Sequence, residues 1–334
     1  MEKYLVVCLG SIGRRHLKNL RSLRPHAKIA VLRLSSAAYP PPPAEADFQF
    51  SDIHAATDFS PTAAIICSPA NEHANIAKIL LERGISVLIE KPLAHEIEGV
   101  DALISLANVK KLTLMTAYNL RYLPSLRSVH RLIHSGAIGH VYAARAEVGQ
   151  YLPDWRPGKP YQDTVSAQKS LGGGALLELS HELDYIYWLF GLPERISASG
   201  GHFSDLEIDV EDMVSMNLEY DTPKRLVNVH VDFLQRSISR TCKFIGSEGT
   251  LLWDGMANTV SMYSTATREW QAIATEPMTD RNQMYLEELS HFLECVEQKV
   301  TPFMAAHEGK DVLKMIKASE KSMQTKTTIH ISHE

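Results

Sequence analysis

Along the first 120 residues, short apolar runs alternate with stretches in which apolar residues recur every three or four positions. The short runs predict buried strands, and the periodic stretches predict helices. The predicted strands are Tyr4–Leu9, Ile29–Leu34, Ala63–Cys67, Val87–Ile89 and Leu112–Thr116, and the predicted helices are Arg14–Leu23 and Ala74–Arg83. Strands that alternate with helices are typical of a parallel sheet with crossover helices, so we expect a doubly wound α/β domain of Rossmann type.

Beyond residue 120 the pattern changes to a series of strand-like segments with few helices between them. The predicted strands are Val141–Val148, Met213–Tyr220, Arg225–Phe233, Thr241–Ile245 and Thr259–Tyr263, and the predicted helices are Ser125–His134, Glu178–Phe190 and Asn282–Gln298. This order favours an α+β domain with a large, mostly antiparallel open sheet. We therefore expect two domains, residues 1–119 and residues 120–334, in a chain that is too long for one ordinary core.

The composition narrows the classes of function. The chain has 45% hydrophobic and 22% charged residues, which is typical of a globular protein. A net charge of −5 gives no general attraction to phosphate backbones or anionic lipids, so neither nucleic acid nor a membrane is an expected partner. No apolar run approaches the roughly 20 residues of a membrane span, and the apolar stretch before Gly10 is too short for a signal peptide.

Cysteines, prolines and basic residues add little chemistry of their own. The four cysteines lie far apart without metal-binding or CxxC spacing, so we expect no metal site and a reducing, cytoplasmic location. The run Pro40–Pro43 predicts a stiff surface loop more readily than a partner motif. The basic residues between Arg14 and Arg24 fall on one predicted helix, where a solvated face is a more ordinary explanation than an anion site.

The first chemical motif is the turn after the first strand, Gly10-Ser11-Ile12-Gly13, which leads directly into a helix. Backbone N–H groups at such a helix start can bind the pyrophosphate of a dinucleotide. The usual fingerprint has a further glycine two positions before Gly10, but here that residue is Cys8. Its side chain should crowd the tight turn, so we expect either a relaxed turn or a strand that ends differently.

The end of the second strand bears on which dinucleotide is bound. About 20 residues past the glycines, an NAD enzyme places Asp or Glu against the ribose 2′-hydroxyl. This chain instead has Arg33 and Ser35 there, which suit a 2′-phosphate. The sequence thus favours NADP over NAD; the alternative is that Arg33 only stacks on the adenine or points to solvent.

A lysine and a histidine are the next candidates. Lys91 follows a predicted strand at its carboxyl end, the side on which open α/β sheets bind ligands, and Pro92 after it ends the strand and could form a cis bond. His181 follows a triple glycine at 172–174, on a predicted helix whose apolar stripe contains Leu183 and Ile186. Helical periodicity places His181 away from that stripe, on the same side as Tyr185 and Trp188, facing solvent or a cleft.

Together these motifs resemble the glucose-fructose oxidoreductase / inositol dehydrogenase / MocA family. The resemblance spans nearly the whole chain, with the motifs in family order. They are Gly10-Ser11-Ile12-Gly13-Arg14-Arg15-His16, Ser68-Pro69-Ala70-Asn71-Glu72-His73, Glu90-Lys91-Pro92-Leu93, Gly172 to Asp184, and Gly246-Ser247-Glu248-Gly249-Thr250-Leu251.

The resemblance implies roles for particular residues. Residues expected to contact the cofactor are Gly10, Ser11, Ile12, Gly13, Arg33, Ser35, Ser68, Pro69, Asn71, His73, Glu90 and Lys91. It further implies that Lys91 lies beside the nicotinamide and the substrate hydroxyl, and that His181 is the general acid/base. The chemistry agrees, because removing hydride from a secondary alcohol needs a base for the hydroxyl proton, and histidine titrates near neutrality. A cation at Lys91 would stabilise the developing alkoxide.

One departure concerns the partner of His181. Most of the family has an aspartate four positions earlier, but Leu177 stands there and the acid is Glu178. Asp184, one turn after His181, competes with Glu178 for the role of orienting the histidine.

The segment Gln150–Ser170 supplies further candidates for substrate binding, because its aromatic and cationic residues suit a polyol with an anionic group. The candidates there are Trp155, Arg156 and Lys169, although the loop could equally pack against a second subunit. The family pattern adds Asn119, Arg121 and Tyr122. It also implies that the exposed face of the second sheet forms a homodimer or homotetramer.

The sequence is therefore interpreted as an NAD(P)-dependent oxidoreductase that moves a hydride to or from a secondary hydroxyl or keto carbon of a sugar, nucleotide-linked sugar or cyclitol. The family also contains non-catalytic proteins that sense a dinucleotide, and such a regulator is the alternative. The presence of both Lys91 and His181 favours the enzyme.

Overall fold

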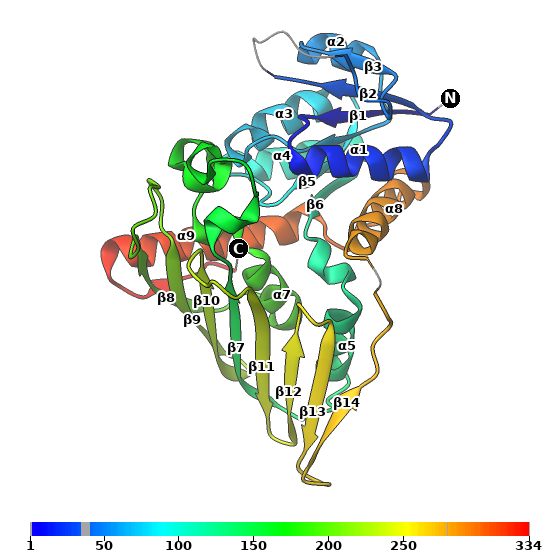
Figure 1. The fold of residues 1–334 in the computed structure, drawn as a ribbon. Coiled ribbons are helices and arrows are strands. Elements are labelled where there is room, and N and C mark those ends of the chain that lie inside the picture. The colour runs from blue at the N-terminus through cyan, green and yellow to red at the C-terminus, as the bar shows by residue number, and fades with distance from the viewer. Residues whose placement is uncertain (1, 35–40, 279, 334) are drawn as a thin grey trace. The chain divides into compact units, whose positions relative to one another are not determined.

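The computed structural model describes residues 2–34, 41–278 and 280–333 (Figure 1). The chain divides into two compact units, one formed by residues 1–119 with 281–310 and the other by residues 120–280 with 311–334. The sequence places the boundary at the same point after residue 119, but it assigns residues 281–310 to the second domain. In the structure this segment returns to the first unit.

The first unit contains a six-stranded sheet in the order β3-β2-β1-β4-β5-β6, with all neighbouring strands parallel. Its strands are β1 (Lys3–Val7), β2 (Lys28–Leu32), β3 (Phe48–Phe50), β4 (Ala63–Ile66), β5 (Ser86–Glu90) and β6 (Leu114–Ala117). Strands β1, β4 and β5 are buried almost throughout, as expected for a parallel sheet covered on both faces. The prediction of a doubly wound parallel sheet is confirmed.

The helices of the first unit are α1 (Ser11–Leu23), α2 (Ile53–Asp58), α3 (Ala70–Glu82), α4 (Val100–Lys110) and α8 (Asn282–Gln298). Helix α8 packs against α1, where Asn19 and Asn282 exchange two side-chain hydrogen bonds of 2.8 and 3.2 Å. The bounds of α8 are those predicted, but local periodicity could not show that its partner is a helix more than 250 residues earlier.

The second unit contains a nine-stranded sheet in the order β14-β13-β12-β11-β7-β10-β9-β8-β15. Its strands are β7 (Val141–Gly149), β8 (Arg195–Gly201), β9 (Met213–Asp221), β10 (Lys224–Asp232), β11 (Ser239–Gly246), β12 (Gly249–Asp254), β13 (Thr259–Ser264), β14 (Glu269–Ile273) and β15 (Ile329–His330). Among the described strand pairs of this second sheet, only β7 and β10 are parallel. The predicted, mostly antiparallel sheet is thus confirmed.

Helices pack on one face of this sheet. They are α5 (Pro124–His134), α6 (Ala175–Glu178) and α7 (His181–Phe190), and a longer helix, α9 (Ala306–Thr325), crosses the boundary between the units. The four short 3-10 segments η2 (Leu152–Trp155), η3 (Tyr161–Asp163), η4 (Val165–Ala167) and η5 (Lys169–Leu171) occupy the predicted irregular loop. Hydrogen bonds from Lys169 N–H to the Asp209 carboxylate and from Glu207 N–H to the Tyr161 hydroxyl anchor this loop to the segment before β9.

Helices α5 and α7 meet through stacked rings. The ring of His130 stacks on His134 at 3.9 Å and on Trp188 at 4.0 Å between ring centroids. Burial, followed by the nearby His134 and Arg121, lowers the pKa of His130 from 6.5 to about 4. The stack therefore holds a neutral imidazole at physiological pH.

This stack predicts a dependence of stability on pH. Above pH 6.5 His130 is neutral in the folded and unfolded chain alike; between pH 6.5 and about 4 only the unfolded chain binds the proton, so stability falls over that interval. The free energy of unfolding of the second unit is measured by denaturant titration from pH 7 to 4. Its decrease with falling pH should have a smaller slope in His130→Phe than in the wild type. The exposed His140, replaced by Gln, serves as control, and an equal slope in all three proteins would contradict the prediction.

Candidate functional site

The turn after β1 has an unusual backbone. Strand β1 ends at Val7, and Cys8 adopts a left-handed conformation with φ of +67° while its N–H donates to the Leu32 carbonyl at 2.8 Å. This conformation favours glycine, the residue expected at this position of the fingerprint. Of the two expected outcomes, the strand ends differently, at Val7 rather than Leu9, while Cys8 adopts the backbone geometry of a glycine rather than relaxing the turn.

The two glycines that remain serve different purposes. A Cβ on Gly13 would lie 2.1 Å from the Cys8 carbonyl oxygen, so only glycine allows α1 to approach this closely. A Cβ on Gly10 would meet nothing within 4 Å, so the space beside it is open. Gly10 precedes α1 without capping it through a side chain, and the first turn contains no acidic residue. These features fit the phosphates of a dinucleotide at the start of α1.

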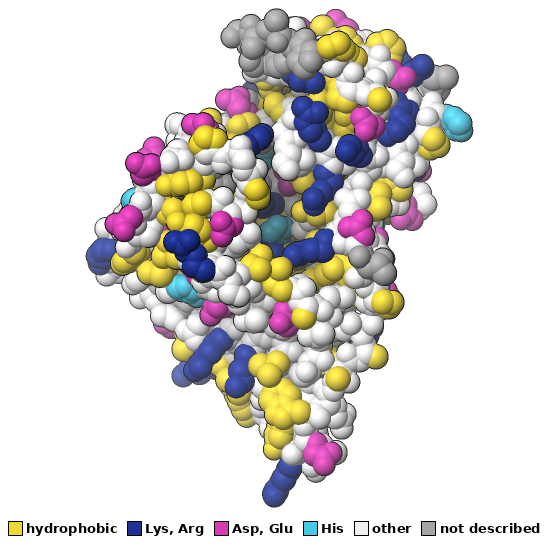
Figure 2. Space-filling model, in the orientation of Figure 1, with side chains coloured by type: hydrophobic (Ala, Val, Ile, Leu, Met, Phe, Trp, Pro, Cys, Tyr) yellow, Lys and Arg dark blue, Asp and Glu magenta, His cyan; other side chains and the backbone are white. Residues whose placement is uncertain are grey.

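The basic residues of α1 lie largely where the sequence predicts them. Arg14, Arg15 and Lys18 are exposed, and Figure 2 shows cationic side chains gathered over this helix. His16 is an exception, because it is completely buried. Arg33 follows β2 and is half-buried, whereas Ser35 and Pro40 lie outside the described residues.

The loop after β4 is tied to the loop after β5. His73 is buried, and its Nδ1 and Nε2 atoms lie 2.9 Å from the carbonyl oxygens of Pro92 and Ser68 respectively. Burial, as the largest influence, lowers the pKa of His73. Its observed contacts make it a clamp between two loops. By contrast, the buried Oγ of Ser68 has no hydrogen-bond partner among the described residues.

Glu90 and Lys91 end β5 and begin the loop that His73 holds. The Lys91–Pro92 peptide bond is cis, as the sequence suggested. The Glu90 carboxylate lies 2.6 Å from His16 Nε2 and also accepts from Lys91 N–H at 3.3 Å, and its expected contact with the cofactor stays a prediction. The contact between His16 and Glu90 was not predicted, because the basic residues around His16 favour a solvated helix face.

Tyr285 of α8 was also missed by the sequence analysis. Its ring lies edge-on to His16 at 6.3 Å, and the Arg15 guanidinium lies 4.4 Å from the ring centroid. Burial raises the pKa of Tyr285, and the hydrogen bond of its hydroxyl with Asn119 opposes this effect. Asn119 is thus buried and engaged within the first unit. No local signal marks Tyr285, since its partners belong to residues far earlier in the chain.

In the second unit, the helix predicted from Glu178 to Phe190 is broken. Helix α6 ends at Glu178, Leu179 and Ser180 separate it from α7, and His181 is the first residue of α7. Helical periodicity therefore does not continue through the break. Tyr185, expected on the side away from the core, is fully buried and packs edge-on against Trp253 at 5.2 Å. His181 itself is half-buried.

The two candidate carboxylates near His181 have partners of their own. Asp184 is fully buried and receives hydrogen bonds from Arg121 Nε and Nη2, the shortest being 2.8 Å. Glu178 accepts from the Ser166 hydroxyl at 3.0 Å. Arg121, which the family pattern placed at the substrate, is 0% exposed and holds the Asp184 carboxylate of α7, while its contact with a substrate stays a prediction.

The triple glycine serves the packing of the loop before α6. A Cβ on Gly173 would lie 2.3 Å from the Val165 carbonyl oxygen, and one on Gly174 would lie 2.4 Å from the Glu211 carboxylate. That carboxylate accepts from Leu176 N–H at the start of α6. The glycines therefore allow residues 165–168 and Glu211 to pack directly against the segment that leads to His181.

The remaining substrate candidates differ in exposure. Arg156 and Lys169 are exposed, and Trp155 is half-buried, with its ring packed against Phe233 and its Nε1 donating to the Gln150 carbonyl. Tyr122 is buried beneath the Arg127 guanidinium. Within the described ranges, no group of three or more His, Cys, Asp or Glu side chains could hold a metal ion. In that same part of the chain, no helix has the length and apolarity needed to cross a bilayer.

Comparison with known protein families matches each unit. Residues 3–118 match the model described as oxidoreductase family, NAD-binding Rossmann fold, and residues 126–252 match the GFO/IDH/MocA C-terminal domain. The chain belongs to the Gfo/Idh/MocA oxidoreductase family. The resemblance inferred from the motifs is thereby confirmed, and with it the NAD-binding character of the first unit.

Individual members of this family show how far the similarity extends. Myo-inositol 2-dehydrogenase of Thermotoga maritima is 23% identical over 98% of this chain and 97% of its own. Trans-1,2-dihydrobenzene-1,2-diol dehydrogenase of Oryctolagus cuniculus is 31% identical, but the match covers 53% of this chain and 51% of that protein. This chain thus spans only about half the length of several of the curated relatives that it matches.

Solved structures of the family share the fold. Levoglucosan dehydrogenase in complex with NADH superposes with a TM-score of 0.87 at 18% identity over 100% of both chains. UDP-N-acetylglucosamine 3-dehydrogenase from Acidithiobacillus ferrooxidans gives a TM-score of 0.76 at 18% identity, covering 97% of this chain and 98% of that chain. At this identity the comparison establishes the architecture of the chain and nothing finer.

The left-handed backbone of Cys8 leads to a prediction about stability. Replacing Cys8 by Gly removes a Cβ that disfavours this conformation, so the variant should be more stable by about 1 kcal/mol. Cys67→Ala is the contrasting variant, because it removes a buried side chain with no positive φ, and it should lower stability. Denaturant titration of the three proteins measures both changes. A Cys8→Gly variant less stable than the wild type would show that the thiol contributes more than the strain costs.

Proposed function

We propose that this chain is an NAD(P)-dependent dehydrogenase or reductase that acts on a secondary hydroxyl or keto carbon of a sugar, nucleotide-linked sugar or cyclitol. The observation that carries the proposal is the uncapped start of α1 beside Gly10, in the same unit as a lysine at the carboxyl end of β5. Support for the substrate class comes from the relative named myo-inositol 2-dehydrogenase, which matches nearly the whole chain.

The cofactor would be held by backbone N–H groups at the start of α1, with Ser68, Pro69 and Asn71 contributing from the loop between β4 and α3. The buried Oγ of Ser68 supports this assignment, because a buried hydroxyl with no hydrogen-bond partner among the described residues is available to a ligand. When bound, the nicotinamide supplies the acceptor or donor of the hydride.

Lys91 and His181 are proposed to handle the proton and the charge. His181 removes the hydroxyl proton in oxidation and returns it in reduction, and the Lys91 ammonium stabilises the alkoxide that develops on the same oxygen. Asp184 and Glu178 are the candidate carboxylate partners of the histidine. The salt bridge between Asp184 and Arg121 supports a role for Asp184 in positioning α7, the helix that begins with His181.

These roles predict the behaviour of two variants. Lys91→Ala and His181→Ala should each lower turnover by roughly 10²-fold or more, because each removes a group that acts on the transition state, while NADH still binds. Turnover is followed by the absorbance of the reduced cofactor over a panel of sugars and cyclitols, and binding by nicotinamide fluorescence. Unchanged turnover in either variant would remove that residue from its role. Cofactor binding by the wild type without turnover of any compound would favour the non-catalytic regulator.

We further propose a preference for NADP over NAD. Arg33 follows β2 in a segment that contains no Asp or Glu between positions 32 and 36, which suits a 2′-phosphate. The dissociation constants of NADPH and NADH, measured by fluorescence, should favour NADPH, and Arg33→Gln should reduce that preference. Binding of NADH at least tenfold tighter than NADPH would overturn the proposal.

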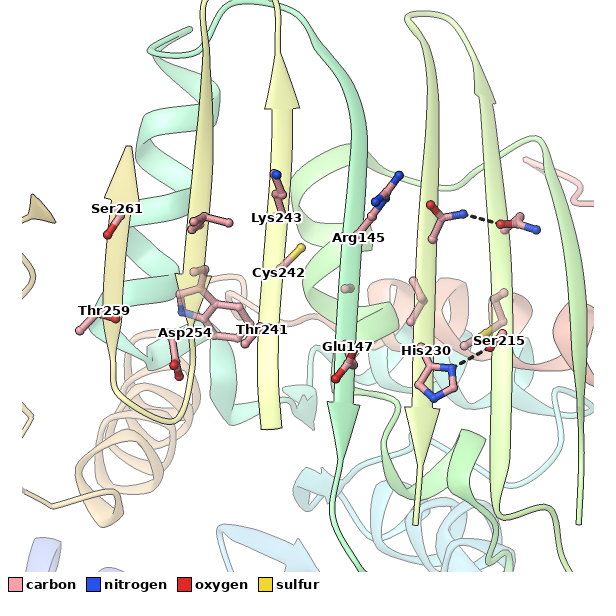
Figure 3. Close-up of a pocket in the computed structure, with 17 residues that line it drawn as sticks. Arg145, Glu147, Ser215, His230, Thr241, Cys242, Lys243, Asp254, Thr259 and Ser261 are labelled. Carbon is pink, nitrogen blue, oxygen red and sulfur yellow. Dashed lines mark hydrogen bonds between the residues drawn. The ribbon is translucent and has the colours of Figure 1, made fainter. Parts of the chain in front are cut away.

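The open face of the second sheet is the proposed contact with a second copy of the chain. It contains a hollow of about 750 Å³, across which two neighbouring rows of side chains run (Figure 3). One row, aligned by the strand register, includes Glu147 and Asp254, and the adjacent row includes Arg145 and Lys243. A copy related by a twofold axis could set the acidic row of one chain against the basic row of the other.

A homodimer or homotetramer is therefore the expected state in solution, with opposite charges in contact between the copies. Light scattering after size-exclusion chromatography measures the mass. The double variant Arg145→Glu/Lys243→Glu should dissociate the assembly, whereas replacing the exposed Lys18 of the other unit by Glu should not. A monomeric wild type at micromolar concentration would contradict this proposal.

A further inference from the structure

The buried carboxylate of Glu90 joins helix α1 to the end of strand β5 and the loop that follows it. One oxygen accepts from His16 Nε2 at 2.6 Å, and the other accepts from the backbone N–H of Lys91 at 3.3 Å. His16 is completely buried, and Glu90 is only 9% exposed. A short hydrogen bond to a carboxylate that is shielded from water is among the stronger polar contacts in a protein, so it restrains both residues.

The contact links the two chemical motifs of this unit. His16 belongs to α1, the helix whose start fits the phosphates, and Glu90 directly precedes Lys91. His16 makes this link through Nε2. Its other ring nitrogen, Nδ1, is buried and has no hydrogen-bond partner in the described part of the chain. The position of the Lys91 backbone thus depends on a side chain from the phosphate-binding helix.

Tyr285 supports the histidine from another side. The two rings are T-shaped with centroids 6.3 Å apart, and Arg15 from the same helix as His16 covers the tyrosine ring. The half-buried ring of Tyr285 therefore limits the movement of His16 away from Glu90. A second buried polar residue of α1, Asn19, forms its side-chain hydrogen bonds with Asn282 of α8 rather than with the end of β5, as far as the described residues show. The helix thus has two buried polar contacts, of which one leads to Lys91.

We propose that His16 is a positioning residue for Lys91, acting through the Glu90 carboxylate. The proposal rests on the proposed function for the role of Lys91 in the reaction, but the link between His16 and the lysine is independent of any substrate. Loss of the link should displace Lys91 from its working position, and displacements of about 1 Å are sufficient to slow an enzyme strongly.

Two conservative variants of His16 separate positioning from mere packing. In His16→Gln the amide nitrogen can occupy the place of Nε2 and still donate to Glu90. In His16→Asn the side chain is one methylene shorter, so the amide cannot reach the carboxylate. Asn19→Leu is the matched control, since it removes the other buried polar contact of the same helix and leaves Glu90 unaffected.

The first readout is the environment of Lys91 itself. Reductive methylation with ¹³C-formaldehyde labels the lysines, and the Lys91 resonance is assigned by its absence in Lys91→Arg. At a fixed pH, His16→Asn should move or broaden this resonance, whereas His16→Gln and Asn19→Leu should leave it as in the wild type. An unmoved resonance in His16→Asn would overturn the proposal, and so would a resonance that moves equally in Asn19→Leu.

The second readout is catalysis on any sugar or cyclitol that the wild type turns over. His16→Asn should lower kcat by about tenfold or more, with the dissociation constant of NADH unchanged within threefold, and His16→Gln should restore most of the rate. Equal kcat in His16→Asn and the wild type would count against the proposal. If the wild type turns over nothing, the proposed function fails, and the resonance of Lys91 still decides whether His16 positions it.

Discussion

The close approach of α1 to the end of β1, possible only because Gly13 lacks a side chain, is the constraint on which the first unit depends. A Cβ at this position would collide with the Cys8 carbonyl oxygen, and moving the helix outwards would carry His16 away from Glu90. The same approach brings the uncapped start of α1 to the edge of the sheet where β5 ends. One missing side chain thus permits both the turn that we propose to hold the phosphates and the buried contact beside Lys91.

The second unit relies on a different device, namely buried ion pairs that fix α7. Arg121 holds Asp184, and Arg240 of β11 donates to the buried Glu182 at 2.9 Å. Buried pairs of this kind contribute little net stability over apolar packing, but breaking one by removing a single partner leaves an uncompensated charge. They therefore define the orientation of the helix more than they stabilise it, which suits a helix that begins with the proposed acid/base.

The sequence predicted those features that depend on neighbouring residues and missed those that depend on residues distant in the chain. Strands such as Val141–Gly149 and the helix Asn282–Gln298 were predicted closely because their apolar patterns are local. The return of α8 to the first unit and the burial of His16 could not be predicted, since both depend on partners distant in the chain. The break before His181 was missed because the apolar spacing continues through Leu179. The residues that contact α6 from outside the helix, Ser166 at Glu178 and Glu211 at Leu176 N–H, lie elsewhere in the sequence and leave no local signal. Local patterns thus located Lys91 and His181, and long-range packing determined which side chains surround them.

The clamp formed by His73 has a consequence that concerns tautomers. Its two ring nitrogens face the carbonyl oxygens of Pro92 and Ser68, and both of these groups can only accept hydrogen bonds. Burial lowers the pKa of His73 and so favours a ring with a single N–H, which can donate to only one of these carbonyls at a time. That N–H then forms a hydrogen bond with the carbonyl of one loop, and the lone pair of the other ring nitrogen faces the carbonyl of the other loop. Moving that hydrogen between the two nitrogens exchanges which loop is bonded, the one that contains Ser68 or the one that follows Lys91, without moving a heavy atom.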